Sequence, residues 1–492
     1  MDEADVRRFG QLFAQFLDRV VDPARANIDP RESIVTRLES FLGADPATLP
    51  VVTEEFRGFE HATVQIALEH LLARPGVEHE LIGVAGGGRA HNSLTEILEM
   101  ARSHAAFRIG AVDYAAVPIS VDADYTCVRF GLYLINDGGD RLAVLLRGEH
   151  EQHGQAAMIE VLAASTERAH EWLAALRDER VKHNTLRGQV LMLSPSMFSP
   201  GAGPVRFVRR PELRRDDVIM PAGVLERVER QVVGVAEHRE RLVAEGRHLK
   251  RGVLLYGPPG TGKTHTVRYL TGALTDFTVV LLAGPSIRFV AEACALARSL
   301  QPALIVLEDC DLVAEDRSFT PDGNPLLFSV LDEMDGLASD SDICFLLTTN
   351  RADLLETALA QRPGRVDLAV EIPLPDEDGR RRLLDVYARG IDLTDAESRV
   401  VVERTAGVPA SFMKELARRA TLVSAARGAE RTESGDVITA MDELMKSQEA
   451  LTRRLLGTAG DDAPDGGSPA GRPDGGAGWF AYAPPRLARY PG

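Results

Sequence analysis

The sequence is poor in cysteine, and its few cysteines are scattered. Cys127, Cys294, Cys310 and Cys344 are the four cysteines in 492 residues, and none forms a CxxC pair. Structural zinc sites and disulfide frameworks need several cysteines at regular spacing, so we predict neither of them. Such cysteine usage suits a reducing compartment, and we expect a cytoplasmic protein.

Long apolar runs and an excess of positive charge are also missing. No apolar run approaches the length of a membrane span, and the N-terminus, Met1-Asp2-Glu3-Ala4-Asp5, is acidic and lacks a signal-peptide core. The formal net charge of −17 at pH 7 disfavours tight binding along bare nucleic acid. We therefore expect a soluble protein without a membrane partner, and we predict that nucleic acid is an unlikely ligand.

One stretch carries a complete motif in the context that the motif requires. Gly257-Pro258-Pro259-Gly260-Thr261-Gly262-Lys263-Thr264 matches G-x-x-x-x-G-K-[ST] at every fixed position. The apolar run before it is typical of a buried strand, and residues 265–270 have helical spacing. The glycines let backbone N–H groups approach phosphate oxygens, and the helix adds the positive end of its dipole. An ordinary Gly-rich turn would not explain Lys263 and Thr264 at this spacing, so we predict a nucleotide site.

Two residues of this motif have specific expected roles. Lys263 is expected to reach the β- and γ-phosphates of ATP, and the hydroxyl of Thr264 is expected to bind Mg²⁺. The other motif residues and His265, which follows at the start of the helix, complete the predicted ATP-binding set.

Acidic, amide and arginine side chains follow two further apolar runs. Residues 303–307 end in Glu308-Asp309-Cys310-Asp311, and residues 343–347 run into Thr348-Thr349-Asn350. The carboxyl ends of parallel strands share the sheet edge where phosphates bind, so these side chains are candidates for catalysis. Arg362-Pro363-Gly364-Arg365 comes next, and a surface salt bridge with Asp367 is the alternative to a catalytic role.

With Met334-Asp335-Gly336, these motifs resemble the AAA family of ATPases over residues 217–455, roughly half of the chain. The resemblance implies a doubly wound parallel α/β sheet with a helical lid, assembled as a homo-oligomeric ring that is usually a hexamer. It also implies that Asn350 helps to orient the attacking water. Arg362 and Arg365 match the arginine fingers that reach the γ-phosphate of the neighbouring subunit.

Two positions depart from the family pattern. The usual acid pair is Asp then Glu, whereas here Glu308 precedes Asp309. By position, Glu308 is expected to bind Mg²⁺ and Asp309 to polarise water with a shorter side chain, and a misplacement of about 1 Å can cost on the order of 10²-fold in rate. In the lid, Gly407-Val408-Pro409-Ala410-Ser411-Phe412 resembles the family's G-x-S-G-A-D segment, with Ser411 where related ATPases carry an arginine.

A segment after the strand at 278–282 resembles the loop that grips polypeptide in the pore of AAA unfoldases. Phe289-Val290-Ala291 matches its aromatic-hydrophobic-glycine pattern, with Ala291 in place of glycine. The alternative is that Phe289 packs against the start of the next helix. No H-E-x-x-H motif follows the module, and the end Arg489-Tyr490-Pro491-Gly492 departs from the hydrophobic-Tyr-X end of proteasome activators.

Changes in residue composition and hydrophobic periodicity along the chain predict its domain organisation. The fold class is α/β, with six parts: an N-terminal helical segment (1–78), a small α/β domain (79–194), a Pro-, Gly- and Arg-rich linker (195–216), the large ATPase subdomain (217–376), the helical lid (377–456) and a disordered tail (457–492).

Three functions are compatible with this organisation. The first is a ring ATPase that remodels, unfolds or threads an unidentified protein held by the N-terminal domain. The second is a slow or non-hydrolysing nucleotide-gated switch or scaffold, motivated by the reversed acid pair. The third, a nucleic-acid motor, rests on the linker arginines alone and is opposed by the overall acidity.

Overall fold

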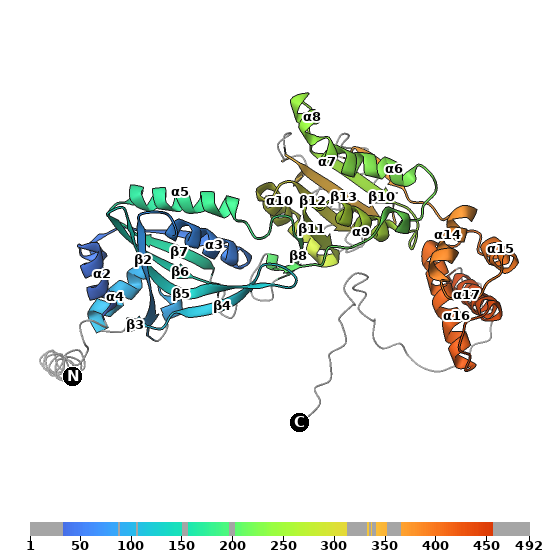
Figure 1. Cartoon of the computed structure of the whole chain (residues 1–492), viewed down its shortest axis with the longest axis horizontal. Helices are drawn as coiled ribbons and strands as arrows, with labels where there is room; N and C mark the ends of the chain where they lie inside the picture. The colour runs from blue at the N-terminus through green and yellow to red at the C-terminus, as the bar shows by residue number, and fades with distance from the viewer. Residues whose placement is uncertain are drawn as a thin grey trace, which may run out of the picture. The chain divides into compact units, whose positions relative to one another are not determined.

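The computed structural model describes residues 33–86, 89–104, 107–149, 156–195, 202–311, 332–333, 336, 341–351 and 366–455. Two seven-stranded sheets and their helices account for most of these residues (Figure 1). Among the described helices, none combines the length and the apolar character needed to cross a membrane.

The first sheet is antiparallel, in the order β1-β7-β6-β5-β2-β3. The strand β2 pairs with the C-terminal part of β5, and β4 pairs with the N-terminal part of the same strand. Its strands are β1 (Val51–Phe56), β2 (Val77–Ala85), β3 (Arg108–Gly110), β4 (Asp113–Pro118), β5 (Asp124–Asp137), β6 (Asp140–Arg147) and β7 (Ala157–Leu162). Its helices are α2 (Ile34–Leu42), α3 (His61–Leu72), α4 (Leu94–His104) and α5 (Thr166–Lys182).

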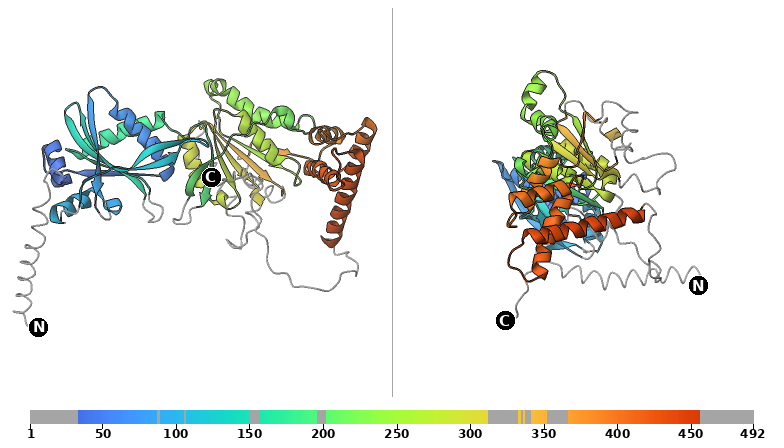
Figure 2. Two further views of the ribbon diagram at one scale, coloured as in Figure 1. Left: turned by 60° about the horizontal axis from the view of Figure 1, so that its bottom comes forward. Right: turned by 90° about the vertical axis from the view of Figure 1, so that its right-hand side faces the viewer.

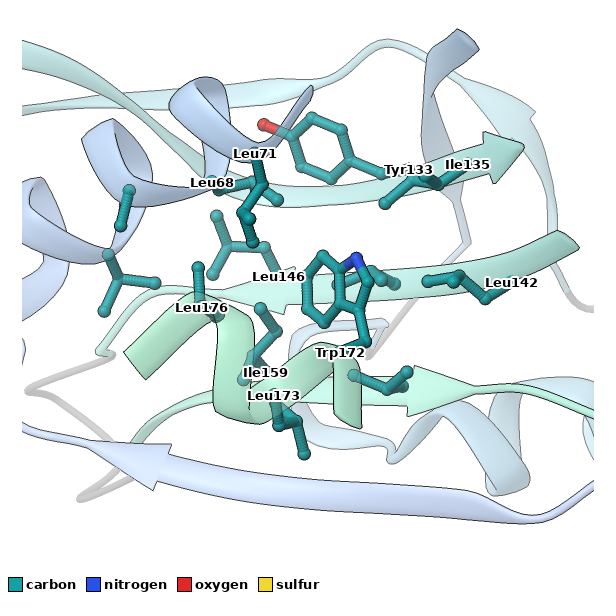
Figure 3. Packing of buried hydrophobic residues seen from close by; sticks show 14 of the residues in the cluster. Leu68, Leu71, Tyr133, Ile135, Leu142, Leu146, Ile159, Trp172, Leu173 and Leu176 are labelled. Atoms are coloured by element: carbon teal, nitrogen blue, oxygen red, sulfur yellow. The ribbon is translucent and has the colours of Figure 1, made fainter. Parts of the chain in front are cut away.

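Successive residues of β5 enter two different cores, because a strand points alternate side chains to opposite faces. Tyr133 and Ile135 pack with residues of α3 and α5, including Trp172 (Figure 3). Leu132 and Leu134 pack with residues of α2 and α4. The sheet is therefore buried on both faces, which gives this part of the chain a substantial core.

These contacts correct the predicted boundary between residues 1–78 and 79–194. The strand β1 lies inside the predicted helical segment and pairs with β7, and β2 crosses the boundary itself. Both α2 and α3 pack on the same sheet. The apolar pattern of this strand is weak, because β1, Val-Val-Thr-Glu-Glu-Phe, is an edge strand with polar residues in its middle.

The second sheet has the order β14-β10-β13-β12-β11-β8-β9. Strand β10 pairs in parallel with β13 and β14, and β8 pairs in parallel with β11. Its strands are β8 (Val190–Pro195), β9 (Ala202–Phe207), β10 (Arg251–Tyr256), β11 (Thr278–Ala283), β12 (Ala303–Glu308), β13 (Ile343–Thr349) and β14 (Leu368–Glu371). Every residue of β12 and β13 is buried, as expected for strands covered on both faces. The predicted parallel α/β sheet is confirmed.

Strands β8 and β9 correct the prediction for residues 189–216. The strand β8 adds to the second sheet next to β11, whereas we assigned it to the small N-terminal domain. Residues 202–207 of the predicted linker form β9, antiparallel to β8. Strand periodicity shows which residues are extended but not which edge they join, because any free edge offers the same backbone hydrogen bonds.

The linker arginines have intramolecular partners in this structure. Arg210 donates to the carbonyl oxygens of Gly188 and Phe277, at 2.9 and 2.8 Å. Arg215 donates to the Glu229 carboxylate. These contacts fix the connector to the ATPase sheet and account for two of the arginines that motivated a nucleic-acid motor.

Four helices follow the second sheet: α14 (Glu377–Tyr387), α15 (Asp395–Arg404), α16 (Ala410–Ala426) and α17 (Ser434–Leu455). They share one core, which includes Leu384, Val401, Met413, Leu416 and Met441. Figure 2 shows these orange-to-red helices gathered into one bundle. We call residues 377–455 the lid.

Candidate nucleotide site

The predicted phosphate loop lies between β10 and α9 (Lys263–Ala273), where the motif requires it. Gly257, Gly260 and Gly262 have φ values of 142°, 76° and 113°. Side chains with a Cβ rarely adopt such backbone conformations, so glycine is needed at all three positions. Gly262 is the N-cap of α9, and no side chain caps this helix end. The loop therefore presents a helix N-terminus, which is a suitable site for phosphate.

Lys263 is held over the loop by backbone carbonyls. Its Nζ donates to the oxygens of Gly257 and Pro258, at 2.8 and 2.9 Å. Burial lowers the pKa of Lys263, and the nearby carboxylates of Asp309 and Asp311 oppose this shift. A buried cation between these acids and the helix end offers a site for an anionic polyphosphate.

His265 contacts the backbone of Asp217. Its Nε2 lies 3.1 Å from the carbonyl oxygen of Asp217, and it donates there because the carbonyl can only accept. Burial is the main cause that lowers the pKa of His265. The side chain thus ties α9 to residue 217, at the start of the segment that leads into the ATPase sheet.

The lid contacts the phosphate loop directly. The backbone N–H of Ser411, in the first turn of α16, donates to the carbonyl oxygen of Gly260 at 3.0 Å. A Cβ on Gly260 would lie 2.2 Å from Ser411 Oγ. Ser411 therefore takes part in the site through its backbone, which the comparison of motifs did not predict.

Gly260→Ala is expected to weaken ATP binding by displacing Ser411 and by straining the loop. Alanine in a left-handed conformation costs about 1–2 kcal/mol, which corresponds to a loss of about 5- to 30-fold in affinity. Titration with a fluorescent ATP analogue measures the effect. Adding Ser411→Gly removes the clashing atom and should restore part of the affinity. Equal affinities of the two variants would show that the lid contact has no influence.

The acid pair lies at the carboxyl end of β12. Glu308 is the last residue of the strand and is buried, and Asp309 follows with a φ of 51°. Asp is among the few non-glycine residues that tolerate this left-handed conformation, and Glu is not. The backbone therefore offers a physical reason for the reversed order, because the shorter acid stands at the strained position.

Asp309 lies among groups that are expected to act on ATP. Burial and the Asp311 carboxylate raise the pKa of Asp309, and Lys263 together with a hydrogen bond from Asn350 opposes the shift. Its backbone N–H donates to Thr348 Oγ1 at 3.0 Å. The structure therefore brings together Lys263, Asp309 and Asn350, which are far apart in the sequence.

Asn350 follows β13 and contacts a carboxylate whose role we did not predict. The backbone N–H of Asn350 donates to Asp311 Oδ1 at 3.1 Å, and Nδ2 lies 3.4 Å from Asp311 Oδ2. Asp311 was visible in the sequence as the last acid of Glu308-Asp309-Cys310-Asp311. Its spacing gave no indication of this contact, because the two segments are joined only by the sheet.

The predicted pore residues are part of the core. Phe289 is 5% exposed and Val290 is 2% exposed. They lie where the 3₁₀ helix η8 (Gly284–Phe289) meets α10 (Val290–Ser299), and Arg288 lies over the Phe289 ring. Ser286 Oγ accepts a hydrogen bond from the N–H of Ala283 at 2.8 Å and so caps the turn before Phe289. This burial favours the alternative, packing at the helix start, and the pore role of these two residues stays a prediction.

Other predicted features lie outside the described residues. Among the site residues these are Arg362, Arg365 and the Met334-Asp335 pair, and among the predicted parts it is the tail at 457–492. Asp367, the possible salt-bridge partner of the arginines, accepts a hydrogen bond from the backbone N–H of Gly252 at 2.8 Å. This contact holds the entry to β14 against β10.

The residues present fit ATP and Mg²⁺. The loop offers a left-handed glycine backbone, an uncapped helix end and a buried lysine, which match the phosphates. Within the described part of the chain, no group of three or more His, Cys, Asp or Glu could hold a metal ion. Mg²⁺ is usually held by one or two protein ligands together with phosphate oxygens, so a threonine and one acid suffice. Bound Mg²⁺ would neutralise charge that develops on the phosphates.

Fold and site together define a P-loop nucleoside triphosphatase with a helical lid. Residues 253–374 match the model of the family described as "ATPase family associated with various cellular activities (AAA)". Residues 253–374 are therefore an AAA-type ATPase domain, and the protein is an ATPase that uses ATP with Mg²⁺.

Several characterised proteins are similar to about half of the chain or less. The proteasome-activating nucleotidase of Thermococcus kodakarensis is 28% identical over 279 residues, which cover 54% of this chain and 70% of the relative. ATP-dependent zinc metalloprotease FtsH 3 of Sphaerobacter thermophilus is 31% identical over 51% of this chain and 53% of its own length. The 26S protease regulatory subunit 6A of Caenorhabditis elegans is 35% identical over 32% of this chain and 39% of its own length.

Proposed function

We propose that this protein is an ATP-driven ring machine that remodels, unfolds or threads protein substrates. The main support for this proposal is that Lys263, Asp309 and Asn350 lie close together at one edge of the sheet. The phosphate loop lies beside them and is contacted by the lid. Similarity to a proteasome-activating nucleotidase and to a 26S protease regulatory subunit supports protein as the substrate.

We assign the residues of the site as follows. Lys263 binds the β- and γ-phosphates, the loop backbone cradles them, and Thr264 and Glu308 bind Mg²⁺. Asp309 polarises the attacking water and Asn350 orients it. Arg362 and Arg365 act on the γ-phosphate bound to a neighbouring subunit, so hydrolysis requires a ring, which we propose to be a homohexamer.

We propose that the ring acts in the cytoplasm. All four cysteines lie among the described residues, and none of them forms a disulfide. The unit built on the first sheet is the proposed holder of the substrate, since it has its own core on both faces of the sheet.

Arg365→Ala is expected to abolish the dependence of ATP turnover on assembly. Wild-type turnover per chain should rise steeply with protein concentration, because each site needs an arginine from a neighbour. The variant should stay low at every concentration, by about 10³- to 10⁵-fold if the arginine acts as a finger. Phosphate release measures turnover, and an unstructured protein added in a parallel series should stimulate only the wild type. Concentration-independent turnover that survives Arg365→Ala would contradict catalysis between subunits.

The nucleotide-gated switch is the second candidate. The reversed pair Glu308-Asp309 favours it, since Asp309 carries the shorter side chain at the position of the catalytic acid. Tight ATP binding without turnover at any concentration, and without stimulation by the unstructured protein, would select the switch.

A further inference from the structure

We propose that Asp311 is a positioning residue for ATP hydrolysis, which fixes the orientation of the Asn350 side-chain amide. This inference rests on the role of Asn350 proposed above. Asp311 itself is not assigned to phosphate, Mg²⁺ or water.

Asp311 supplies a hydrogen-bond acceptor at the point where the pairing between β10 and β13 ends. The ladder between β10 and β13 stops at the pair Tyr256 and Thr349, so the next residue, Asn350, lies beyond the last pair. A backbone N–H at such a point still requires an acceptor when it is partly buried. The carboxylate of Asp311 supplies it, with Oδ1 at 3.1 Å from the N–H of Asn350.

The same carboxylate also binds the side chains around this N–H. Thr349 Oγ1 donates to Asp311 Oδ1 at 3.1 Å, and Asn350 Nδ2 lies 3.4 Å from Oδ2. Thr349 Oγ1 in turn accepts from the N–H of Arg351 at 3.0 Å. Asp311 is 9% exposed and Thr349 is fully buried, so little water competes for these contacts.

A second contact ties the end of β13 to the acid pair. Thr348 Oγ1 accepts from the backbone N–H of Asp309 at 3.0 Å. Thr348, Thr349 and Asn350 are therefore each bonded to the segment that follows β12. Any shift of this segment would move Asn350 and Asp309 together.

The chemistry of the partners then decides which way the Asn350 amide faces. Its side chain contacts two carboxylates, those of Asp309 and Asp311, and ionised carboxylates only accept hydrogen bonds. The NH₂ end must therefore face the acids, and the carbonyl Oδ1 takes the opposite end. An acceptor at that end is what orienting a water molecule by its O–H group requires.

The decisive variant is Asp311→Asn. Asparagine keeps the size of the side chain and can still accept from Thr349 Oγ1 and from the N–H of Asn350. Its own NH₂ group would then face the NH₂ group of Asn350, and two donors cannot form a hydrogen bond. The Asn350 amide would therefore lose its fixed orientation. We expect kcat to fall by roughly 10- to 100-fold, while the affinity for a fluorescent ATP analogue and the melting temperature stay close to wild type.

A pair of threonine variants tests the contact from the other side. Thr349→Val removes the hydroxyl and keeps the volume, and it should lower kcat without changing ATP affinity. Thr349→Ser keeps the hydroxyl and should restore most of the turnover. Hydrogen exchange in the nucleotide-free protein gives a readout independent of activity, since Asp311→Leu removes the acceptor of the Asn350 N–H and should speed its exchange.

Asp342→Asn is the matched control. Asp342 is buried just before the opposite end of β13 and accepts from Arg251 Nη1 at 3.0 Å. This variant should lower the melting temperature but leave kcat unchanged at temperatures where the protein is folded.

Asn350→Ala separates the two proposals. Wild-type turnover in Asn350→Ala would remove the proposed role of Asn350. Reduced turnover in Asn350→Ala, with wild-type kcat in both Asp311→Asn and Thr349→Val, would overturn the positioning role of Asp311 alone.

Discussion

Asp309→Asn is expected to stop ATP turnover while ATP affinity stays close to wild type. Asparagine keeps the shape of the side chain and its hydrogen-bonding reach, but it cannot accept a proton from the attacking water. General-base catalysis typically contributes about 10²- to 10⁴-fold to a rate, so kcat should fall by at least the lower figure. Steady-state phosphate release and titration with a fluorescent ATP analogue measure the two quantities separately.

Glu308→Gln is the matched control for this prediction. Under our assignment Glu308 binds Mg²⁺, so Glu308→Gln should raise the Mg²⁺ concentration needed for half-maximal turnover, whereas Asp309→Asn should not. Normal turnover in Asp309→Asn, with turnover lost in Glu308→Gln at any Mg²⁺ concentration, would reverse the two roles.

A double variant, Glu308→Asp with Asp309→Glu, tests why the order of the two acids is reversed. The exchange restores the usual order of the family but places Glu at a φ of 51°. A left-handed backbone costs roughly 1–2 kcal/mol for residues other than glycine, with Asp among those that tolerate it best. We expect lower stability and lower turnover than wild type. Improved turnover would show that backbone conformation did not select the order.

Removal of residues 1–210 is expected to leave an ATPase module that is insoluble or unfolds at a much lower temperature. The loss of β8 and β9 exposes the edge of β11 and uncovers apolar surface beside it. Val190, Leu191 and Leu193 are each at most 2% exposed, and full burial of such a side chain is worth about 1.5–3 kcal/mol. Their combined contribution is comparable with the total stability of a domain, about 5–15 kcal/mol.

A chain that begins at residue 187 is the matched control, since it keeps β8, β9 and Arg210 and loses only the first sheet with its helices. Soluble yield and thermal melting followed by circular dichroism compare the two truncations. In the full-length chain, Arg210→Leu should lower the melting temperature, because the carbonyls of Gly188 and Phe277 lose their donor. Equal melting temperatures of the two truncations would show that β8 and β9 are dispensable.

Features that depend on neighbouring residues were predicted well. The phosphate loop is the main example, because its glycine conformations and the position of Lys263 follow from spacing along the chain. A run of a few residues contains all the information that such structures need.

Features that depend on distant residues were predicted poorly. The burial of Phe289 is set by the turn that Ser286 caps and by the core that this turn meets, and an aromatic residue at a helix start suits a pore and a core equally. The strand β8 lies within the predicted bounds of the small N-terminal domain, but its partner β11 lies about ninety residues further on. Hydrophobic periodicity identifies a buried face without identifying what covers it.

The sequence by itself determined the phosphate loop, the parallel α/β class and the identity of the acids and the amide at the sheet edge, because each follows from local spacing and from the rule that parallel strands share one edge. Only the tertiary structure decided the lid contact of Ser411, the placement of β8 and β9, and the contact of Asp311 with Asn350. The physical reason is that each joins segments that are distant in the sequence, and sheet pairing and packing alone bring their atoms within hydrogen-bonding distance.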